Sequence, residues 1–312
     1  MARMSSWAST GGIVALVIAD AALVLLAILH VTGYAGGSST DAPRLGKVPD
    51  SSVGPGQGQG QGRPNNPASS PLETGPVLLD AAADGTILRA GRGSCGDDAS
   101  GPPPVIDMST DGGATVDPVD LGRPVGDVLR VSAGGANDLF LVGADPAACA
   151  LAIYNSTDGG ESWLPSPGTA GAWHIASVGT RRVHTPGGSA PVGCDVLALS
   201  AYSESGARVL CTDGELRGTA SGGTSWVGLG SLQGAVDIGY ETPADGWAIA
   251  TTRDCPAAVL RTADGGVDWE ETACLDAEGE PQALSVAGRL IVVQVGGELL
   301  TSSDDGVTFA QP

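Results

Sequence analysis

The eight residues STDGGESW, Ser156–Trp163, belong to a pattern that occurs five times and decides the fold. The other copies are STDGGATV from Ser109, TASGGTSW from Thr219, TADGGVDW from Thr262 and SSDDGVTF from Ser302. Successive copies begin 47, 63, 43 and 40 residues apart, a spacing typical of four-stranded propeller blades. The sequence therefore predicts an all-β chain that forms a β-propeller of about five four-stranded blades.

The residue types of the repeat suit a tight turn between two strands. Its fifth position is always glycine, which adopts positive φ without steric cost. Its third position is aspartate in every copy except at Ser221, and this carboxylate can accept hydrogen bonds from the backbone N–H groups of the turn. Its eighth position is Trp or Phe in every copy except at Val116, and we expect the large side chain to fill the core of the blade. The predicted structural residues are Asp111, Gly113, Asp158, Gly160, Trp163, Gly223, Trp226, Asp264, Gly266, Trp269, Asp304, Gly306 and Phe309.

The composition agrees with an all-β fold. The 312 residues include 49 Gly and 21 Pro, and only 4% are aromatic although 42% are hydrophobic. The core must then come from Val, Leu, Ile and Ala in short strands joined by many turns. Short apolar runs predict four strands in each repeat from Val77 onward, with no obvious exchange of a terminal strand to close the ring.

The third repeat is longer than a blade requires. Between Trp163 and Thr219 the chain has one strand and one loop in excess. Long insertions in a rigid scaffold often carry function, although extra length is also tolerated at little cost. The insertion contains the most basic part of an acidic domain, and it could bind an acidic group or form a solvated loop whose arginines balance nearby carboxylates. The candidate binding patch consists of Trp173, His174, Arg181, Arg182 and His184.

The chain before Val77 differs in character. Residues 1–11 are predicted to be a short cytoplasmic segment, and 12–34 are mostly apolar, with Asp20 as the only charged residue. This length matches the roughly 20 residues of a membrane-spanning helix, so we expect a signal anchor; a signal peptide cleaved after Ala35 is the alternative. Residues 35–76, rich in Gly, Pro, Ser and Gln, are expected to form a flexible, disordered linker to the propeller at 77–312.

The cysteines indicate the compartment of the propeller. All six follow the apolar segment, and an even number suits disulfides in an oxidising environment. The sequence leaves their pairing open, although we favour Cys194 with Cys211, Cys255 with Cys274, and Cys95 with Cys149. We therefore expect a single-pass protein of the cell membrane with its C-terminal domain outside the cytoplasm.

The charge narrows the range of partners. The formal net charge is −20, and because acids and bases balance before Gly75, the whole excess lies in the later part of the chain. Such a domain repels phosphate backbones and anionic headgroups, which argues against nucleic acid as a partner. No ligand spacing suggests a metal and no motif suggests a cofactor, so we predict neither.

The repeats resemble Asp boxes, S-x-D-x-G-x-[ST]-[WF], also called bacterial neuraminidase repeats. The stretch DGWAIATTRDCPAAVLRTADGGVDW, Asp245–Trp269, is similar to the blades of photosystem II assembly/stability factor-like propellers. The resemblance covers the chain from about Val77 and implies a propeller with its boxes between the third and fourth strands of each blade. In sialidase-like members it would imply three arginines, a Tyr/Glu pair and an Asp acid/base, but these do not map onto this chain. In the assembly factors it would imply a membrane-protein partner.

These observations predict a membrane-anchored, extracytoplasmic propeller that acts as a non-catalytic binding or assembly scaffold for a protein partner. The alternative is an exported glycan-binding or sialidase-like glycoside hydrolase propeller, because many carboxylates remain that could form an unfamiliar pair. A cleft lined by Trp, Tyr and paired carboxylates would favour the alternative, since sugar sites need aromatic platforms.

Overall fold

The computed structural model describes residues 76–96 and 103–312. The chain divides into two units, Met1–Pro64 and Asn65–Pro312, and all the regular elements of the described ranges are β-strands of the second unit. The predicted segments 1–11 and 12–34, and all but the last residue of the predicted linker, lie outside the described residues. Within the described ranges, no helix has the length and apolar character needed to cross a membrane.

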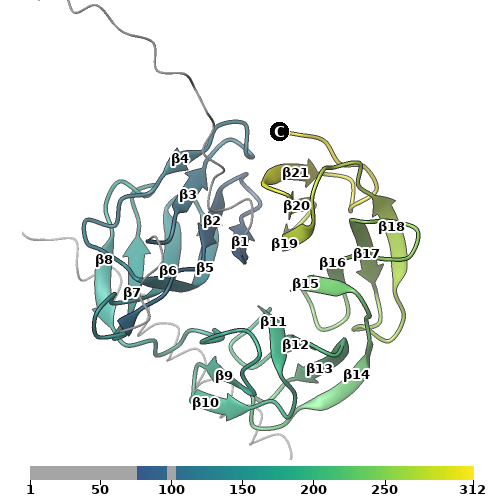
Figure 1. The fold of residues 1–312 in the computed structure, drawn as a ribbon, viewed down its shortest axis with the longest axis horizontal. Coiled ribbons are helices and arrows are strands. Elements are labelled where there is room, and N and C mark those ends of the chain that lie inside the picture. The colour runs from purple at the N-terminus through teal and green to yellow at the C-terminus, as the bar shows by residue number, and fades with distance from the viewer. Residues whose placement is uncertain (1–75, 97–102) are drawn as a thin grey trace, which may run out of the picture. The chain divides into compact units, whose positions relative to one another are not determined.

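Five antiparallel sheets surround a common axis as the blades of a propeller (Figure 1). Blade 1 contains β1 (Val77–Ala81), β2 (Ile87–Gly91), β3 (Ile106–Ser109) and β4 (Asp117–Pro118). Blade 2 contains β5 (Asp127–Gly135), β6 (Asp138–Ala144), β7 (Leu151–Ser156) and β8 (Leu164–Pro167). Blade 3 contains β11 (Val196–Ala201), β12 (Ala207–Cys211), β13 (Glu215–Thr219) and β14 (Val227–Ser231). Blade 4 contains β15 (Ala235–Tyr240), β16 (Gly246–Ala250), β17 (Ala258–Thr262) and β18 (Glu270–Cys274). Blade 5 contains β19 (Pro281–Ala287), β20 (Leu290–Val295) and β21 (Glu298–Ser302).

Two features differ from the regular five-blade pattern. Blade 5 has three strands rather than the expected four, because the residues after Phe309 add only one bridge, between Thr301 and Ala310. A sixth, two-stranded sheet lies between blades 2 and 3 and pairs β9 (Arg182–Thr185) with β10 (Gly188–Pro191). The extra strand and loop expected in the third repeat therefore form a hairpin outside the blades.

Each repeat turn begins at the last residue of the third strand of its blade and shares one hydrogen-bonding scheme. In blade 1 the Ser109 hydroxyl donates to Asp111 at 2.8 Å and accepts a bond from the Gly113 N–H at 2.8 Å. The carboxylate of Asp111 in turn accepts the Thr115 N–H at 2.9 Å. These bonds stabilise the ionised carboxylate and lower its pKa, as they do in the other turns that have an aspartate.

The turn of blade 3 follows the same scheme with a hydroxyl in place of the carboxylate. Ser221 accepts the Ser225 N–H at 3.1 Å, and the Thr219 hydroxyl accepts the Gly223 N–H at 3.2 Å. The fifth-position glycine has positive φ in all five turns, for example 105° at Gly266. A Cβ added at Gly266 would lie 2.1 Å from a methyl group of Leu216. The positive φ and this close approach of Leu216 therefore both exclude a side chain at Gly266.

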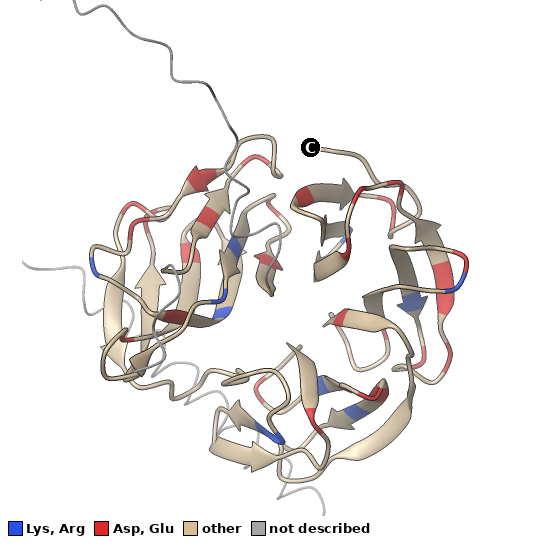
Figure 2. Cartoon of the chain, in the orientation of Figure 1, with Lys and Arg blue, Asp and Glu red and all other residues tan. Residues whose placement is uncertain are grey.

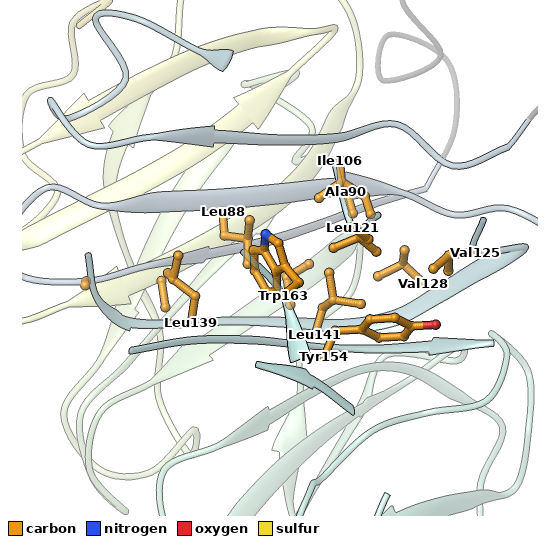
Figure 3. Close-up of a cluster of buried hydrophobic side chains, with 13 residues drawn as sticks. Leu88, Ala90, Ile106, Leu121, Val125, Val128, Leu139, Leu141, Tyr154 and Trp163 are labelled. Carbon is orange, nitrogen blue, oxygen red and sulfur yellow. The ribbon is translucent and has the colours of Figure 1, made fainter. Parts of the chain in front are cut away.

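The eighth residue of each turn packs between its own blade and the structural element that precedes it around the ring. Trp163 is 6% exposed and lies among side chains of blades 1 and 2, including Leu88 and Leu139 (Figure 3). Trp269 packs between blades 3 and 4, and Phe309 packs between blades 4 and 5. The equivalent Val116 packs between blades 5 and 1. The aromatics are therefore part of the hydrophobic core, which the short aliphatic strands alone would fill less well.

Three disulfides cross-link the described ranges, and they join the pairs favoured from the sequence. Cys95–Cys149 connects loops of blades 1 and 2. Cys194–Cys211 joins the residues before β11 to the end of β12, and Cys255–Cys274 joins the loop before β17 to the end of β18. No free cysteine remains among the described residues.

Candidate functional site

Residues 168–195, here called the insertion, separate blade 2 from blade 3 (Figure 1). Its first part runs beside β9, where the backbones of His174 and His184 exchange hydrogen bonds of 3.1 and 2.8 Å. The indole of Trp173 meets Trp226 edge to face, with ring centroids 6.3 Å apart, and donates its N–H to the carbonyl of Ser203 at 3.1 Å. The insertion thus shares the hydrophobic core of blade 3 by packing against Trp226, the eighth residue of the repeat turn. In the other blades the eighth residue packs against the preceding blade.

Two arginines connect the insertion to blades 1 and 2. Arg130 on β5 donates a hydrogen bond of 2.8 Å to the carbonyl of Trp173. Arg92, which follows β2, donates one of 2.8 Å to the carbonyl of Ala176 and also forms a bidentate pair with Asp127, at 2.9 and 2.7 Å. The insertion is therefore held between blades 2 and 3 by packing on one side and charge-assisted hydrogen bonds on the other.

The structure divides the predicted binding patch into an inner and an outer part. Trp173 and His174 are 3% and 1% exposed, and the rings of His174 and His184 stack with centroids 4.3 Å apart. Burial, with the neighbouring His184 in second place, lowers the pKa of His174 to about 4. Arg181 and Arg182 lie on the exposed side of the insertion, where Arg182 donates to the Ser189 hydroxyl at 2.9 Å. The two arginines remain a predicted binding surface.

A second group of polar residues, absent from the sequence predictions, joins the inner strands of neighbouring blades. The carboxylate of Asp80 accepts the Ala133 N–H at 3.0 Å. The hydroxyl of Ser200 accepts the Tyr240 N–H at 2.8 Å, and the carboxylate of Asp237 accepts the Leu284 N–H at 2.9 Å. The hydroxyl of Ser285 closes the ring, because it accepts the Ala81 N–H at 3.0 Å. We call these four side chains, Asp80, Ser200, Asp237 and Ser285, the inner-strand clamps.

The clamps satisfy backbone groups that would otherwise lie unpaired at the free edges of the inner strands. They occupy four of the five junctions between consecutive blades, and the insertion occupies the remaining one, between blades 2 and 3. A polar residue in an otherwise apolar inner strand, as in VLLDA, VLALSA, AVDIGY and ALSVA, is the sequence signal that could have revealed them.

The inner strands and the insertion surround an axial cavity of about 1030 Å³. Its wall combines aliphatic side chains of all five inner strands with the clamps and a few charged groups. The charged residues are Asp80, Arg92, Arg130, Asp237 and Glu280. A volume of this order is at the upper end of the range for small-ligand sites.

The two clamp carboxylates differ in their electrostatic surroundings. Burial raises the pKa of Asp80, while its backbone hydrogen bond and the charge of Arg130 act in the opposite direction. Burial raises the pKa of Asp237 to about 7, opposed only by its two backbone hydrogen bonds. In the described part of the chain, the salt bridges do not include Asp237. Among the described residues, the half-buried Asp237 therefore has no salt-bridge partner.

The features that would favour a sugar site are present only in part. Trp173 and Tyr240 contribute to the wall of the axial cavity, but both are buried, and every Trp, Tyr and Phe of the described ranges is buried or half-buried. Their ring faces are used by neighbouring side chains, as in the edge-to-face contact of Tyr240 with Trp269. Among the described residues, Cys211, Asp213 and Glu215 are close enough to share a metal ion, but the thiol of Cys211 is used in a disulfide.

No protein-family model matches the chain, and no curated protein matches it. Among solved structures, YCF48 from Cyanidioschyzon merolae is 18% identical, with 70% of this chain and 77% of that chain covered and a TM-score of 0.44. YCF48 bound to a D1 peptide is 15% identical, with 77% and 94% covered and a TM-score of 0.44. The Aleuria aurantia lectin in complex with Fucα1-6GlcNAc is 12% identical, with 77% and 94% covered and a TM-score of 0.48. Similarity at this level does not indicate a shared function, so the function has to be argued from the site itself.

Proposed function

We propose that this chain is a non-catalytic binding propeller, displayed outside the cytoplasm on a membrane anchor at 12–34, and that it docks a protein partner through the insertion. In the same proposal the five repeat turns are Asp boxes, which hold the blades together rather than contact the partner. The apolar run at 12–34 and the even number of cysteines after it support the anchor and the location.

The observation that carries the proposal is the exposed side of the insertion. Arg181 and Arg182 are both exposed there, at the start of β9. The nearest carboxylate to Arg181, that of Asp195, is 3.9 Å away, and both side chains are more than half exposed. Such a pair contributes little to stability. Arginine is enriched at protein interfaces, and we expect the partner to present complementary acidic groups to this pair.

The support beneath this surface is rigid, which favours docking without loss of conformational entropy. Arg181 donates to the carbonyl of Gly193 at 2.9 Å. Arg217 of β13 donates to the carbonyl of Val192 at 3.0 Å. The disulfide Cys194–Cys211 ties the end of the insertion to blade 3. These contacts restrain the backbone on which the two arginines lie.

The glycan alternative finds less support. A sugar ring stacks on an exposed aromatic face, and the described ranges offer no exposed aromatic side chain. The carboxylates of the axial cavity, Asp80 and Asp237, accept hydrogen bonds from backbone N–H groups of neighbouring blades, which is a structural role.

The test is cross-linking and affinity capture from intact membranes. We compare the wild type with Arg181→Ala/Arg182→Ala and with a control, Arg253→Ala/Arg289→Ala, which removes the same charge from exposed positions of blades 4 and 5. We expect a protein captured by the wild type and the control to be lost from the Arg181/Arg182 variant. The thermal melt of that variant should be nearly unchanged, because both side chains are exposed. Equal capture by all three proteins would refute docking through the insertion.

A further inference from the structure

The inner-strand clamps provide an internal comparison within one ring. Ser200 and Ser285 each bind a backbone N–H of the next inner strand through a neutral hydroxyl. Asp80 and Asp237 perform the same task with a carboxylate, which loses hydration energy when it is buried in ionised form. Because a hydroxyl suffices at two of the junctions, the clamp function alone does not explain an ionisable group at the other two.

The surroundings explain Asp80 but not Asp237. Asp80 accepts the hydroxyl of Ser285 at 3.0 Å and is stabilised by the charge of Arg130. Asp237 accepts the N–H groups of Ile238 and Leu284, both at 2.9 Å. No arginine of the described residues forms a salt bridge with it. The charge of this carboxylate is thus uncompensated within the cavity.

The charged groups around the cavity are distributed unevenly. The arginines of the wall, Arg92 and Arg130, belong to blades 1 and 2, and Arg92 is neutralised by Asp127 at 2.7 Å. Asp237 lies on the opposite side, on β15, and the exposed Glu280 immediately precedes the neighbouring strand β19. This wall of the cavity, between blades 4 and 5, therefore carries an excess of negative charge. The ring around it is acidic as well, with many acids and few arginines (Figure 2).

The position of the two acids defines the shape of an occupant. Glu280 lies four residues before Leu284, the contact of Asp237 on β19, which corresponds to about 13 Å along a strand at roughly 3.3 Å per residue. The wall of the cavity also includes the half-buried Leu78 of β1, Leu197 of β11 and Val236 of β15. A group that reaches Asp237 from this end must be narrow, and its stem must tolerate aliphatic surroundings.

We propose that the axial cavity binds a primary ammonium group on a slender aliphatic chain, with Asp237 as its counterion and Glu280 at the entrance. The ammonium replaces the missing cation beside Asp237, and the chain lies against the aliphatic wall. A free alkylamine and the amine of a flexible peptide segment share this chemistry. The site is separate from the outer surface of the insertion, so it does not depend on the protein partner proposed above.

Binding of a cation should also release protons. With a pKa of about 7, Asp237 is partly protonated near neutral pH, and an adjacent ammonium favours its ionised form. The other ionisable groups of the wall are Asp80, Glu280, Arg130, Arg92, His174 and Tyr240. Of these, Arg130 and Arg92 lie on the far side. Proton release that disappears with Asp237 would assign the effect to this carboxyl.

The experiment is isothermal titration calorimetry of the full chain in detergent, with n-pentylamine as the probe and n-pentanol as its uncharged match. A short peptide with a free amino terminus and one lysine forms a second arm. Two variants remove the charge: Asp237→Asn, and Asp237→Ser, which copies the clamps at Ser200 and Ser285 and so controls for folding. Asp254→Asn removes an exposed acid of the same blade as a matched control.

We expect pentylamine to bind the wild type and Asp254→Asn equally, and to bind both Asp237 variants at least tenfold more weakly. Heats measured at pH 6.5 in buffers of different ionisation enthalpy should show proton release with the wild type only. Tighter binding of the peptide than of pentylamine would identify a peptide segment as the source of the ammonium, and the reverse would identify a free amine. Equal affinity for pentanol, unchanged binding in the Asp237 variants, or no binding of either amine would overturn the proposal.

Discussion

Replacing Asp237 by Asn should change how the stability of the propeller depends on pH. Asp237 has a pKa of about 7 in the folded chain against an ordinary value of 3.8. Between these values the folded chain keeps a proton that the unfolded chain has released. By linkage, the stability associated with Asp237 is fully present below about pH 4 and is lost as the pH rises through 7. Each pH unit of the interval corresponds to about 1.4 kcal/mol, so the full effect is roughly 4 kcal/mol.

His174 acts in the opposite direction over much of the same range. Its pKa falls from 6.5 to about 4 in the folded chain, chiefly because it is buried. As the pH falls from 6.5 to 4, the unfolded chain gains a proton on His174 that the folded chain does not bind, and this destabilises the fold by roughly 3 kcal/mol. In the wild type the effects of Asp237 and His174 on the free energy of unfolding nearly cancel between pH 4 and 6.5. In Asp237→Asn only the effect of His174 remains, so the stability of the variant should rise with pH over this range.

The assay is urea unfolding without reductant, at pH 4.5, 5.5, 6.5 and 7.5, for the wild type and Asp237→Asn. The difference between their free energies of unfolding removes the contributions of Asp80 and the repeat turns, which both proteins share. Asparagine keeps the size of the side chain and one acceptor oxygen, so the pH-independent cost is that of one hydrogen bond, about 1 kcal/mol. Relative to the wild type, the variant should gain several kcal/mol between pH 4.5 and 7.5. A difference that stays constant across this range would refute the account of Asp237 as a desolvated acid.

Three further substitutions test the core, the repeat turns and the covalent link between blades. Trp163→Ala should lower the free energy of unfolding by about 3–5 kcal/mol, and a loss below about 1 kcal/mol in urea would mean that this residue is not core. Ser221→Asp should stabilise the propeller by about 0.5–1.5 kcal/mol, since it gives blade 3 the carboxylate found in the other four turns; a lower midpoint in urea would count against the shared scheme. Replacing Cys95 and Cys149 by Ser should cost about 2–4 kcal/mol, and the difference should vanish when both proteins are measured with reductant.

The repeat made the blades predictable. Its spacing and its turn residues placed the third strand of every blade, because the Ser/Thr hydroxyl, the carboxylate and the glycine all act within one turn. The aromatics at the eighth position could be assigned to the core because the chain has few other large side chains to fill it. The sequence left the disulfide pairing open, and only Cys194 with Cys211 was favoured because the two residues flank a predicted hairpin.

Contacts between blades were not predictable in the same way. The clamp role of Asp237 depends on the register between β15 and β19, which belong to different sheets, and no local pattern encodes that register. For the same reason Trp173 and His174 were grouped with Arg181 as one patch, whereas in the structure the first two are buried and Arg181 is exposed. The predicted outer strand of blade 5 formed only the bridge at Thr301, since an edge strand depends on pairing partners rather than on its own sequence.

The most direct test of docking through the insertion is site-specific photo-cross-linking in intact membranes. A photoreactive amino acid is placed at Gly187, in the exposed tip of the β9–β10 hairpin, or at Asp254, an exposed position in blade 4. The account predicts a discrete adduct with one protein from position 187, weakened by Arg181→Ala/Arg182→Ala, and none from position 254. Adducts from position 254 alone, or from 187 without dependence on the arginines, would contradict it.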